Sequence, residues 1–573
     1  MSEINRDAAP AHESNSVVIV GAGLAGLVAA YEATQAGRKV ILVDQENANN
    51  LGGQAFWSLG GIFLVDSPEQ RRLGVKDNRE LAEQDWFNSA QYDREEDFWG
   101  RKWAKAYLDF AAGEKRDYLR GLGVKFLPVV GWAERGEGRA DGHGNSVPRF
   151  HLTWGTGPEI VRVFAEPLAK AAKAGLVEYR HRHRVDEIVV KDGRAVGVRG
   201  KVLVECDGLP RGEASSREET GEGFEIRGAA VCIATGGVGG NLDAVRKCWP
   251  VERLGEMPED MVCGVPAHVD GRGIEIAETA GANLVNRDRM WHYTEGMMNW
   301  NPIWPNHGIR IIPGPSALWF DAEGKRLPAP YIPGADTVGT MKHILATGHT
   351  YSWFVLNKNI VSKEFIFSGS EQNPDITDKD IKKLVGKVTS GVAAPIQAFM
   401  DHGEDWVVAD TLEELVEGMN RVTGAAGSGE TPDAPTINLE DLRRQIHLRD
   451  LQTANPYAKD YQVNYVNVAR NFLGDKIIRS VAPSPILDPK NGPLIAIRLR
   501  MLTRKTLGGI ETNLDGQAMR ADGSVFEGLY AAGEASGFGG GGVHGNNALE
   551  GTFLGGCIFS GRQAGRAMAR ESR

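Results

Sequence analysis

The chain of 573 residues carries 75 acidic and 65 basic residues, which gives a formal net charge of −10. Its 42% hydrophobic and 24% charged residues are typical of a globular protein with more than one domain. No cluster of Lys and Arg indicates a nucleic-acid partner, no apolar stretch is long enough to span a membrane, and residues 1–16 lack the apolar core of a signal peptide.

The five cysteines lie far apart and form no C-x-x-C pair. Scattered thiols of this kind predict neither a disulfide framework nor a metal site, and they fit a reducing compartment. We therefore expect a cytoplasmic protein with free cysteines and no bound metal. The 72 glycines suggest a backbone that repeatedly passes close to a ligand, although turns could absorb many of them.

The stretch from residue 17 to residue 44 has the pattern of a dinucleotide-binding unit. An apolar strand, 17–20, leads into a G-x-G-x-x-G turn, a helix over 24–36 and a second apolar strand, 40–43. The glycines allow a tight turn and a close approach of backbone to a pyrophosphate, and a helix N-terminus favours negative charge. A carboxylate at the end of the second strand can bind a ribose hydroxyl. The expected contacts to the dinucleotide are Gly21, Ala22, Gly23, Leu24, Ala25, Gly26, Asp44 and Gln45.

Two glycine pairs follow in residues 51–66, on either side of a short apolar segment. Backbone without side chains can lie against a diphosphate and the edge of a flat ring, and the Ser58 hydroxyl can hydrogen-bond to the ligand. Two ordinary loops are the alternative interpretation. The contacts expected from this segment are Gly52, Gly53, Gln54, Ser58, Gly60 and Gly61.

The next part of the chain alternates between helical and strand patterns. Residues 77–122 have a helical period, with aromatic residues at spacings that favour a helix core over a ligand pocket. A loop at 131–144 and a helix at 158–174 precede two strands joined by a turn at Asp192-Gly193. A buried strand beginning at residue 229 then runs into small residues that can lie beside a cofactor. The contacts expected here are Val185, Ala234, Thr235, Gly236 and Gly237.

The composition changes between about residue 270 and residue 485, where Trp and Met residues crowd together. We expect this part to form a second domain that is inserted into the first and closes over the site as a cap. Its aromatic and Met residues suggest a pocket for an apolar, ring-sized substrate, with an ordinary domain core as the alternative. The stretch 424–436 is expected to be a surface loop.

The dinucleotide-binding pattern returns over residues 505–569. A hairpin turn at Asp522-Gly523 and a buried strand at 529–532 lead into a glycine-rich loop. An apolar helix then starts near Glu550, and its N-terminus could face a ring carbonyl or a phosphate. The contacts expected from this segment are Gly533, Glu534, Ala548 and Leu549.

Taken together, these segments resemble the fumarate reductase and succinate dehydrogenase flavoprotein family, which includes the 3-ketosteroid dehydrogenases. The matching motifs are VVIVGAGLAGLVAA, LGGQAFWSLGG, AAVCIATGG, DGRGIEIAETAGA, KTLGGIETN, GLYAAGEASG and GRQAG, spread from residue 17 to residue 565. The closing segment GGGGVHGNNALEGTFLGG is most similar to steroid-dehydrogenase-like bacterial FAD-binding dehydrogenases.

The resemblance implies FAD as the cofactor and an α/β fold. A doubly wound, Rossmann-like FAD-binding domain is expected in two segments, residues 1–270 and 486–573, with residues 271–485 inserted as an α+β cap domain. The expected function is that of an FAD-dependent dehydrogenase of a CH–CH bond next to a carbonyl in an apolar, steroid-like substrate. Hydride would pass to flavin N5 and then to an unidentified electron acceptor.

Several positions depart from the patterns of the family. The loop after the second strand contains no histidine, so FAD is expected to be bound without a covalent bond. Ala548 lies near the place of a fumarate reductase arginine that clamps a carboxylate, and the segment that follows Arg326 lacks the second cap arginine, so a small diacid is not the expected substrate. Ile495 lies near the place of a tyrosine of 3-ketosteroid 1-dehydrogenases, which puts classical 1-dehydrogenation in question.

Dehydrogenation next to a carbonyl requires donors for an enolate oxygen and a group that accepts a proton. The candidate donors are the backbone N–H groups of Gly508 and Gly509. A tyrosine, with a pKa of about 10, needs nearby positive charge to act as a base, and Arg326, Arg504 or Lys505 could supply it. For each tyrosine alone, a hydrogen-bonded core position is the alternative. The candidate proton-transfer groups are His292, Tyr293, Tyr331 and Tyr351.

Three other functions are compatible with parts of the pattern. The first is an ene-reductase of the same family that runs in the reducing direction. The second is an electron-transfer module without a small substrate of its own, which would need no proton-handling residues. The third, a nicotinamide dehydrogenase, is disfavoured because no second G-x-G-x-x-G follows a strand.

Overall fold

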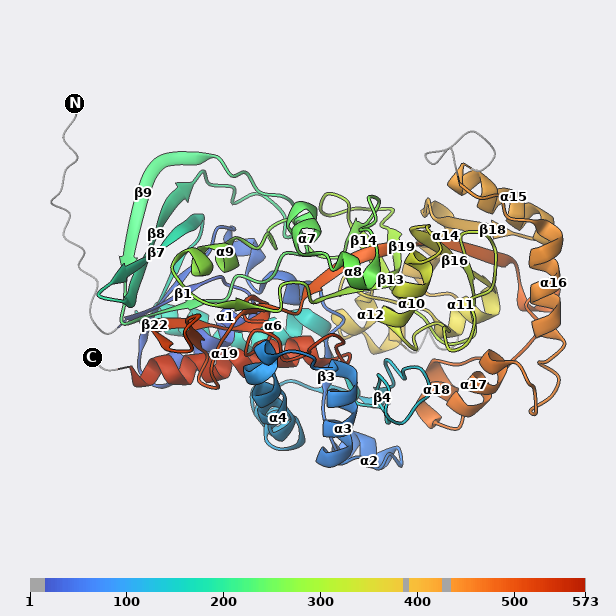
Figure 1. The fold of residues 1–573 in the computed structure, drawn as a ribbon, viewed down its shortest axis with the longest axis horizontal. Helices are drawn as coiled ribbons and strands as arrows, with labels where there is room; N and C mark the ends of the chain where they lie inside the picture. Colours follow the sequence, from blue (N-terminus) through green and yellow to red (C-terminus); the bar gives the residue numbers. More distant parts are fainter. Residues whose placement is uncertain (1–15, 385–390, 425–433, 572–573) are drawn as a thin grey trace.

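The computed structural model describes residues 16–384, 391–424 and 434–571. It contains a mainly parallel sheet, formed by segments from both ends of the chain, and a second large sheet built mostly from the middle of the chain (Figure 1). The surface loop expected at residues 424–436 lies mostly outside the described residues. Within the described ranges, no helix is both long and apolar enough to cross a membrane.

The first sheet has six strands within the described residues, in the order β21-β22-β10-β1-β2-β6. All neighbouring strands run parallel except β21 and β22, which form a hairpin. The apolar runs near residues 17–20 and 40–43 form adjacent strands that are almost completely buried, as expected for a parallel sheet with helices on both faces. The strands are β1 (Ser16–Val20), β2 (Lys39–Val43), β6 (Val177–Arg180), β10 (Ala230–Ile233), β21 (Gln517–Met519) and β22 (Val525–Ala531).

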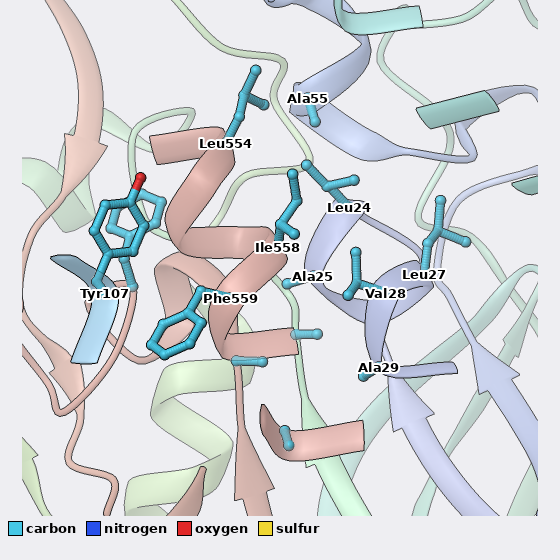
Figure 2. Packing of buried hydrophobic residues seen from close by; sticks show 14 of the residues in the cluster. Leu24, Ala25, Leu27, Val28, Ala29, Ala55, Tyr107, Leu554, Ile558 and Phe559 are labelled. Atoms are coloured by element: carbon cyan, nitrogen blue, oxygen red, sulfur yellow. The ribbon is translucent and has the colours of Figure 1, made fainter. Parts of the chain in front are cut away.

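Helices α1 (Leu24–Gln35) and α19 (Thr552–Arg570) bring the two ends of the chain together. Their apolar side chains interleave in one buried cluster (Figure 2). A Cβ on Gly561 or Gly565 would lie 2.5 Å from the backbone oxygen of Ala25 or Ala29, respectively. Only glycine permits this approach of the helix backbones, which explains the two glycines of the GRQAG motif.

The remaining elements of this half surround the parallel sheet. Strands β7 to β9 form an antiparallel sheet, and the predicted hairpin turn at Asp192-Gly193 joins the first two of them. Residues 77–122 are helical, as predicted. The elements are β3 (Gly61–Phe63), β4 (Phe126–Gly131), β5 (Phe150–Thr153), β7 (His183–Lys191), β8 (Arg194–Leu203), β9 (Glu219–Arg227), α2 (Pro68–Arg72), α3 (Arg79–Ala90), α4 (Phe98–Ala112), α5 (Lys115–Gly121), α6 (Thr156–Lys173), α7 (Leu242–Cys248), α8 (Val251–Leu254) and α9 (Arg272–Thr279).

The second large sheet has eight strands within the described residues, centred on β19 (Leu494–Thr506). The Trp and Met residues of this region lie largely in its apolar core. β19 lies after residue 485, in the segment expected to belong to the FAD-binding domain, but it pairs with strands of the middle segment. The domain boundaries stay a prediction. The other elements are β11 (Val262–Cys263), β12 (Leu284–Val285), β13 (Met290–Met298), β14 (Gly308–Ile312), β15 (Leu318–Asp321), β16 (Tyr351–Asn357), β17 (Ile366–Phe367), β18 (Trp406–Ala409), β20 (Gly509–Ile510), α10 (Thr337–Leu345), α11 (Lys358–Glu364), α12 (Pro374–Thr377), α14 (Ala394–His402), α15 (Leu412–Thr423), α16 (Leu439–Asp450), α17 (Tyr461–Ala469) and α18 (Leu473–Ile478).

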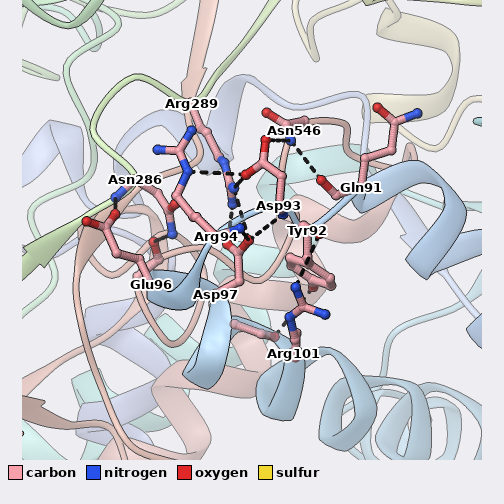
Figure 3. Close-up of polar contacts among 12 residues, drawn as sticks. Gln91, Tyr92, Asp93, Arg94, Glu96, Asp97, Arg101, Asn286, Arg289 and Asn546 are labelled. Atoms are coloured by element: carbon pink, nitrogen blue, oxygen red, sulfur yellow. Dashed lines mark hydrogen bonds and ion pairs between the residues drawn. The ribbon is translucent and has the colours of Figure 1, made fainter.

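A buried ion-pair network anchors the start of β13, the strand that carries Tyr293 (Figure 3). The Arg289 side chain is fully buried and donates to Asp93 at 2.6 Å and to Asp97 Oδ2 at 3.0 Å. The Arg289 carbonyl accepts a hydrogen bond from the Leu507 N–H at 3.0 Å. Since breaking a buried pair leaves an uncompensated charge at a cost of about 3–5 kcal/mol, this network fixes β13 between the helical region and the end of β19.

Candidate functional site

A deep cleft follows the carboxyl ends of the parallel strands. It begins at Val20, Val43 and Ile233, which end or nearly end their strands, and it encloses about 1670 Å³ including the part that is open to solvent. Ligands of doubly wound folds bind at this edge of the sheet. Its lining includes the first glycine turn and also residues of β13 and β14, so the cleft extends from the parallel sheet to the second large sheet.

Glycine backbone forms the floor of the cleft. Gly23 and Gly52 form an isolated parallel bridge, and the backbone of Gly52 has a φ of +94°, a conformation that favours glycine. A Cβ on Gly53 would lie 3.3 Å from the Gly23 Cα, so a side chain there would crowd this floor. The N-terminus of α1 has no side-chain cap, which leaves its amides available to an anionic group such as a diphosphate.

Buried polar atoms without protein partners also line the cleft. Among the described residues, Thr235 Oγ1 and His268 Nε2 are buried and make no hydrogen bond. Buried polar atoms are normally hydrogen-bonded, so these two fit contacts to a ligand. Asp44 Oδ2 accepts the Ala22 N–H at 2.6 Å, and Oδ1 accepts the Glu46 N–H at 2.8 Å. Burial raises the pKa of Asp44, while these amide hydrogen bonds oppose the shift.

Most of the residues expected to contact FAD line this cleft. Those that line it are Gly21, Gly23, Leu24, Ala25, Asp44, Gln45, Gly52, Gly53, Gln54, Ser58, Gly61, Val185, Ala234, Thr235, Gly236, Gly533 and Glu534. The lining does not include Ala22, Gly26, Gly60, Gly237, Ala548 and Leu549. Gly26 has a packing role instead, because a Cβ there would lie 2.0 Å from the Gly21 carbonyl oxygen, where α1 meets the turn.

A polar cluster connects the two ends of the chain inside the cleft. Gln54 Nε2 donates to Glu534 Oε2 at 2.5 Å, and the Lys505 ammonium contacts both the Gln54 side-chain oxygen and Glu534. Burial lowers the pKa of Lys505, and Glu534 opposes this shift. Gln54 lies more than 400 residues from both Lys505 and Glu534 in the sequence, and all three side chains line the cleft.

Tyr293, Arg310 and Glu550 meet in the same cleft. The Tyr293 hydroxyl donates to Glu550 Oε1 at 2.9 Å, and Arg310 Nη1 donates to the same oxygen at 2.7 Å. The Arg310 guanidinium lies 3.5 Å from the centroid of the Tyr293 ring. Burial, and then the charge of Glu550, raise the pKa of Tyr293 well above its usual range. The phenol is therefore protonated at neutral pH and donates to a carboxylate.

Further carboxyl groups lie behind Arg310. Glu295 Oε2 lies 3.8 Å from Arg310 Nε and accepts no hydrogen bond among the described residues. Burial raises the pKa of Glu295 to about 7, and Arg310 opposes this shift. On the other side, Glu134 Oε1 lies 3.8 Å from Arg310 Nη2 and accepts the Thr337 hydroxyl at 2.6 Å. Arg310 is thus surrounded by three acidic side chains, of which only Glu550 lines the cleft.

The structure places the other expected catalytic residues outside the cleft lining. His292 is buried, its Nδ1 accepts the Arg504 N–H at 3.1 Å, and burial lowers its pKa to about 3, so its ring is neutral near pH 7. Arg326 is paired with Asp460 at 2.7 Å and lines a separate small cavity together with Tyr331. The Gly508 N–H, expected to donate to an enolate oxygen, instead donates to the Arg289 carbonyl at 3.4 Å.

The sequence did not indicate Arg310 as a catalytic candidate, and it indicated Glu550 only as the place near which a helix starts. Two local signals mark them: Arg310 interrupts the apolar strand GIRII, and Glu550 is a charged residue in the glycine-rich loop NNALEGT. Neither signal indicates that residues 240 positions apart meet. Of the cations proposed for the site, Arg504 and Lys505 do line the cleft.

The sequence matches the model of a protein family described as "FAD binding domain" over residues 16–554. The chain belongs to this family. FAD, predicted from the sequence, is therefore confirmed as the cofactor, and the glycine floor and unpartnered polar atoms of the cleft fit it. The residues named above as lining the cleft would hold this FAD, with the α1 N-terminus at its diphosphate.

The flavoprotein is similar in sequence to two relatives and in fold to one solved structure. It is 57% identical to a KsdD-like steroid dehydrogenase of Mycolicibacterium smegmatis, over 97% of this chain and 99% of the relative. It is 25% identical to a fumarate reductase (cytochrome) of Shewanella frigidimarina, over 98% of this chain and 78% of the relative. The structure of 3-ketosteroid delta1-dehydrogenase from Sterolibacterium denitrificans shares the fold, with a TM-score of 0.68 and 14% identity over 97% of this chain and 100% of that chain. The predicted family and fold class are confirmed.

Proposed function

We propose that the flavoprotein oxidises a CH–CH bond next to a carbonyl in an apolar, steroid-like substrate. The substrate class is supported by the steroid dehydrogenase that is 57% identical to this chain. The chemistry is supported by one observation, the contact of Tyr293 with Glu550 and Arg310 in the cleft that fits FAD. When bound, FAD supplies the two-electron acceptor for such an oxidation.

Tyr293 and Glu550 form the proton-accepting unit of this proposal. A protonated phenol can accept a proton from a substrate carbon only if it gives up its own proton at the same time. Glu550 Oε1, 2.9 Å from the Tyr293 oxygen, is placed to take that proton. The C–H proton then resides on Tyr293 and the former phenol proton on Glu550, while Arg310 keeps the carboxyl group in position at 2.7 Å.

Arg504 is the proposed donor to the substrate carbonyl. It lines the cleft, and its guanidinium also donates to the Gly264 carbonyl, which fixes its orientation. Burial lowers its pKa, but a guanidinium stays charged in proteins. A positive charge in a water-poor site stabilises negative charge that develops on a carbonyl oxygen.

The same residues argue against two other functions. Glu550 adds negative charge to the cleft, which disfavours a dicarboxylate substrate and therefore a fumarate-type reaction. A module that only transfers electrons needs no buried phenol and carboxylate that can exchange a proton. A cytoplasmic location is part of the proposal, supported by five unpaired cysteines, and cell fractionation tests it.

Anaerobic mixing tests the function and its direction. The oxidised flavoprotein is mixed with a panel of saturated and unsaturated 3-ketosteroids, and the absorbance of the oxidised flavin is followed. We expect at least one saturated ketone to bleach the flavin and to be recovered with a new carbon–carbon double bond. Reoxidation of the reduced flavin by an enone, without bleaching by any ketone, would assign the reducing direction. A flavin that responds to neither class would leave only electron transfer.

A further inference from the structure

One end of the molecule carries large apolar side chains that stay exposed in the described chain. Helices α16, α17 and α18 lie there, with α16 at the outer edge and α18 packed against β4 (Figure 1). Of the fifteen large hydrophobic side chains that are exposed in the described residues, seven fall between residues 448 and 477. They are Leu448, Leu451, Tyr457, Tyr461, Val468, Leu473 and Ile477, exposed by 36–93%. We call this set the helical-end surface.

The cations beside the helical-end surface are two exposed lysines. Residues 439–487, counted from the start of α16, contain seven Lys and Arg, four Asp and one Glu, a net charge of +2 in a chain whose net charge is −10. Lys459 and Lys476 are exposed beside the apolar side chains, whereas Arg443 and Arg444 pair with the exposed acids Glu440 and Asp441 in the first turn of α16. An apolar surface flanked by cations has the composition of segments that bind at the interface of an anionic membrane.

From Asp450 onward, the three acidic residues of this segment face the interior, where each has a partner. Asp460 is paired with Arg326 at 2.7 Å, and Asp475 is paired with Arg135. Asp450 accepts the Ile486 N–H at 2.8 Å. Residues 450–487 therefore bury their acids and expose Lys459 and Lys476, although the whole protein is acidic.

We propose that the helical-end surface docks onto an anionic phospholipid membrane. The exposed apolar side chains would enter the boundary between head groups and acyl chains, while Lys459 and Lys476 would contact lipid phosphates. A second copy of this chain is a poorer occupant, because a symmetric interface would place the same cations of two copies against each other. A steroid-like substrate partitions into the same lipid, so docking would bring enzyme and substrate together. That last link rests on the proposed function, whereas the docking itself does not.

Vesicle co-sedimentation of the FAD-loaded protein tests the proposal. We expect binding to vesicles of phosphatidylcholine mixed with phosphatidylglycerol, and much weaker binding to phosphatidylcholine alone. Binding should fall as salt is added, because the Debye length shortens to about 8 Å at physiological ionic strength. The double variant Lys459→Gln/Lys476→Gln should bind about 25-fold more weakly, at about fivefold for each lysine removed. Leu473→Ser/Ile477→Ser should also lose binding.

Matched variants elsewhere on the surface serve as controls. Lys170→Gln/Lys173→Gln removes two cations from the last turn of α6 and should leave vesicle binding unchanged. Val190→Ser/Leu514→Ser removes two exposed apolar side chains elsewhere. Equal binding to both kinds of vesicle, no binding at all, or equal losses in test and control variants would overturn the proposal. So would a dimer in solution that Leu473→Ser/Ile477→Ser dissociates, because it would assign the helical-end surface to a second copy. Neither result depends on steroid turnover, so the docking and the proposed function can fail separately.

Discussion

The buried carboxyl group of Glu295 should make the stability of the protein fall as pH rises, and Glu295→Gln should remove this effect. Burial raises its pKa from 4.5 to about 7, so between these values the folded protein keeps a proton that the unfolded chain releases. The stabilisation is complete below the unfolded value and is lost as pH rises through the folded value. At about 1.4 kcal/mol for each pKa unit, the loss amounts to about 3 kcal/mol. Only 1% of the side chain is exposed, so solvent screening does not reduce this figure much.

Thermal unfolding of the wild type and of Glu295→Gln at pH 5 and pH 8 measures this difference. The variant should gain stability relative to the wild type at the higher pH, while the exposed control Glu222→Gln should show no such change. Because a protein of this size need not unfold in one step, infrared spectroscopy of the folded protein supplies a second readout. The protonated carboxyl band that disappears near pH 7 should be weaker in Glu295→Gln than in the wild type, but not absent, because burial also raises the pKa of Glu371 to about 7. An equal stability difference at both pH values, with the same titrating band in both proteins, would refute the reasoning.

Three further predictions concern the site. Glu550→Gln should lower kcat about 10²–10⁴-fold with unchanged FAD content, because the amide cannot accept the phenol proton. Steady-state kinetics on a ketone that bleaches the flavin in the anaerobic screen would measure this fall. An unaffected kcat would exclude the proposed role of Glu550. Gly52→Ala should reduce FAD occupancy, measured by flavin absorbance per chain, because a Cβ there lies 2.5 Å from Val161 and the φ of +94° disfavours alanine; full occupancy would contradict this. Acid precipitation should release FAD into the supernatant, whereas yellow protein in the pellet would reveal a covalent bond.

The sequence allowed much of the FAD-binding half to be predicted because its signals are local. Gly21 and Gly26 lie on a single strand–turn–helix unit, and the packing of Gly26 against the Gly21 carbonyl follows directly from that unit. The assignment of β19 to the second sheet could not be read in the same way. Its apolar run, LIAIRLRML, fits any buried strand, and its partners are decided by contacts with β13 and β16 that are distant in the chain.

The reacting residues were only partly predictable for the same reason. Tyr293 could be selected because a tyrosine near a flavin has a clear chemical use. Arg326 carried an equally good motif, but in the folded protein it is paired with Asp460, 134 residues away in the chain. Arg310 and Glu550 become recognisable only when β14 and the turn before α19 are brought together. The role of a charged residue depends on its partner, and the partners of Arg310 and Arg326 lie more than 100 residues away in the sequence.

The measurement that tests the account most directly is the single-turnover rate of flavin reduction in Tyr293→Phe. The phenyl ring can keep its place under the Arg310 guanidinium, so the variant removes the hydroxyl and little else. We predict a rate about 10²–10⁴-fold below that of the wild type, with the same FAD content, while the control Tyr331→Phe keeps the wild-type rate because Tyr331 lies outside the cleft lining. Reduction of the flavin by Tyr293→Phe at the wild-type rate would contradict the account.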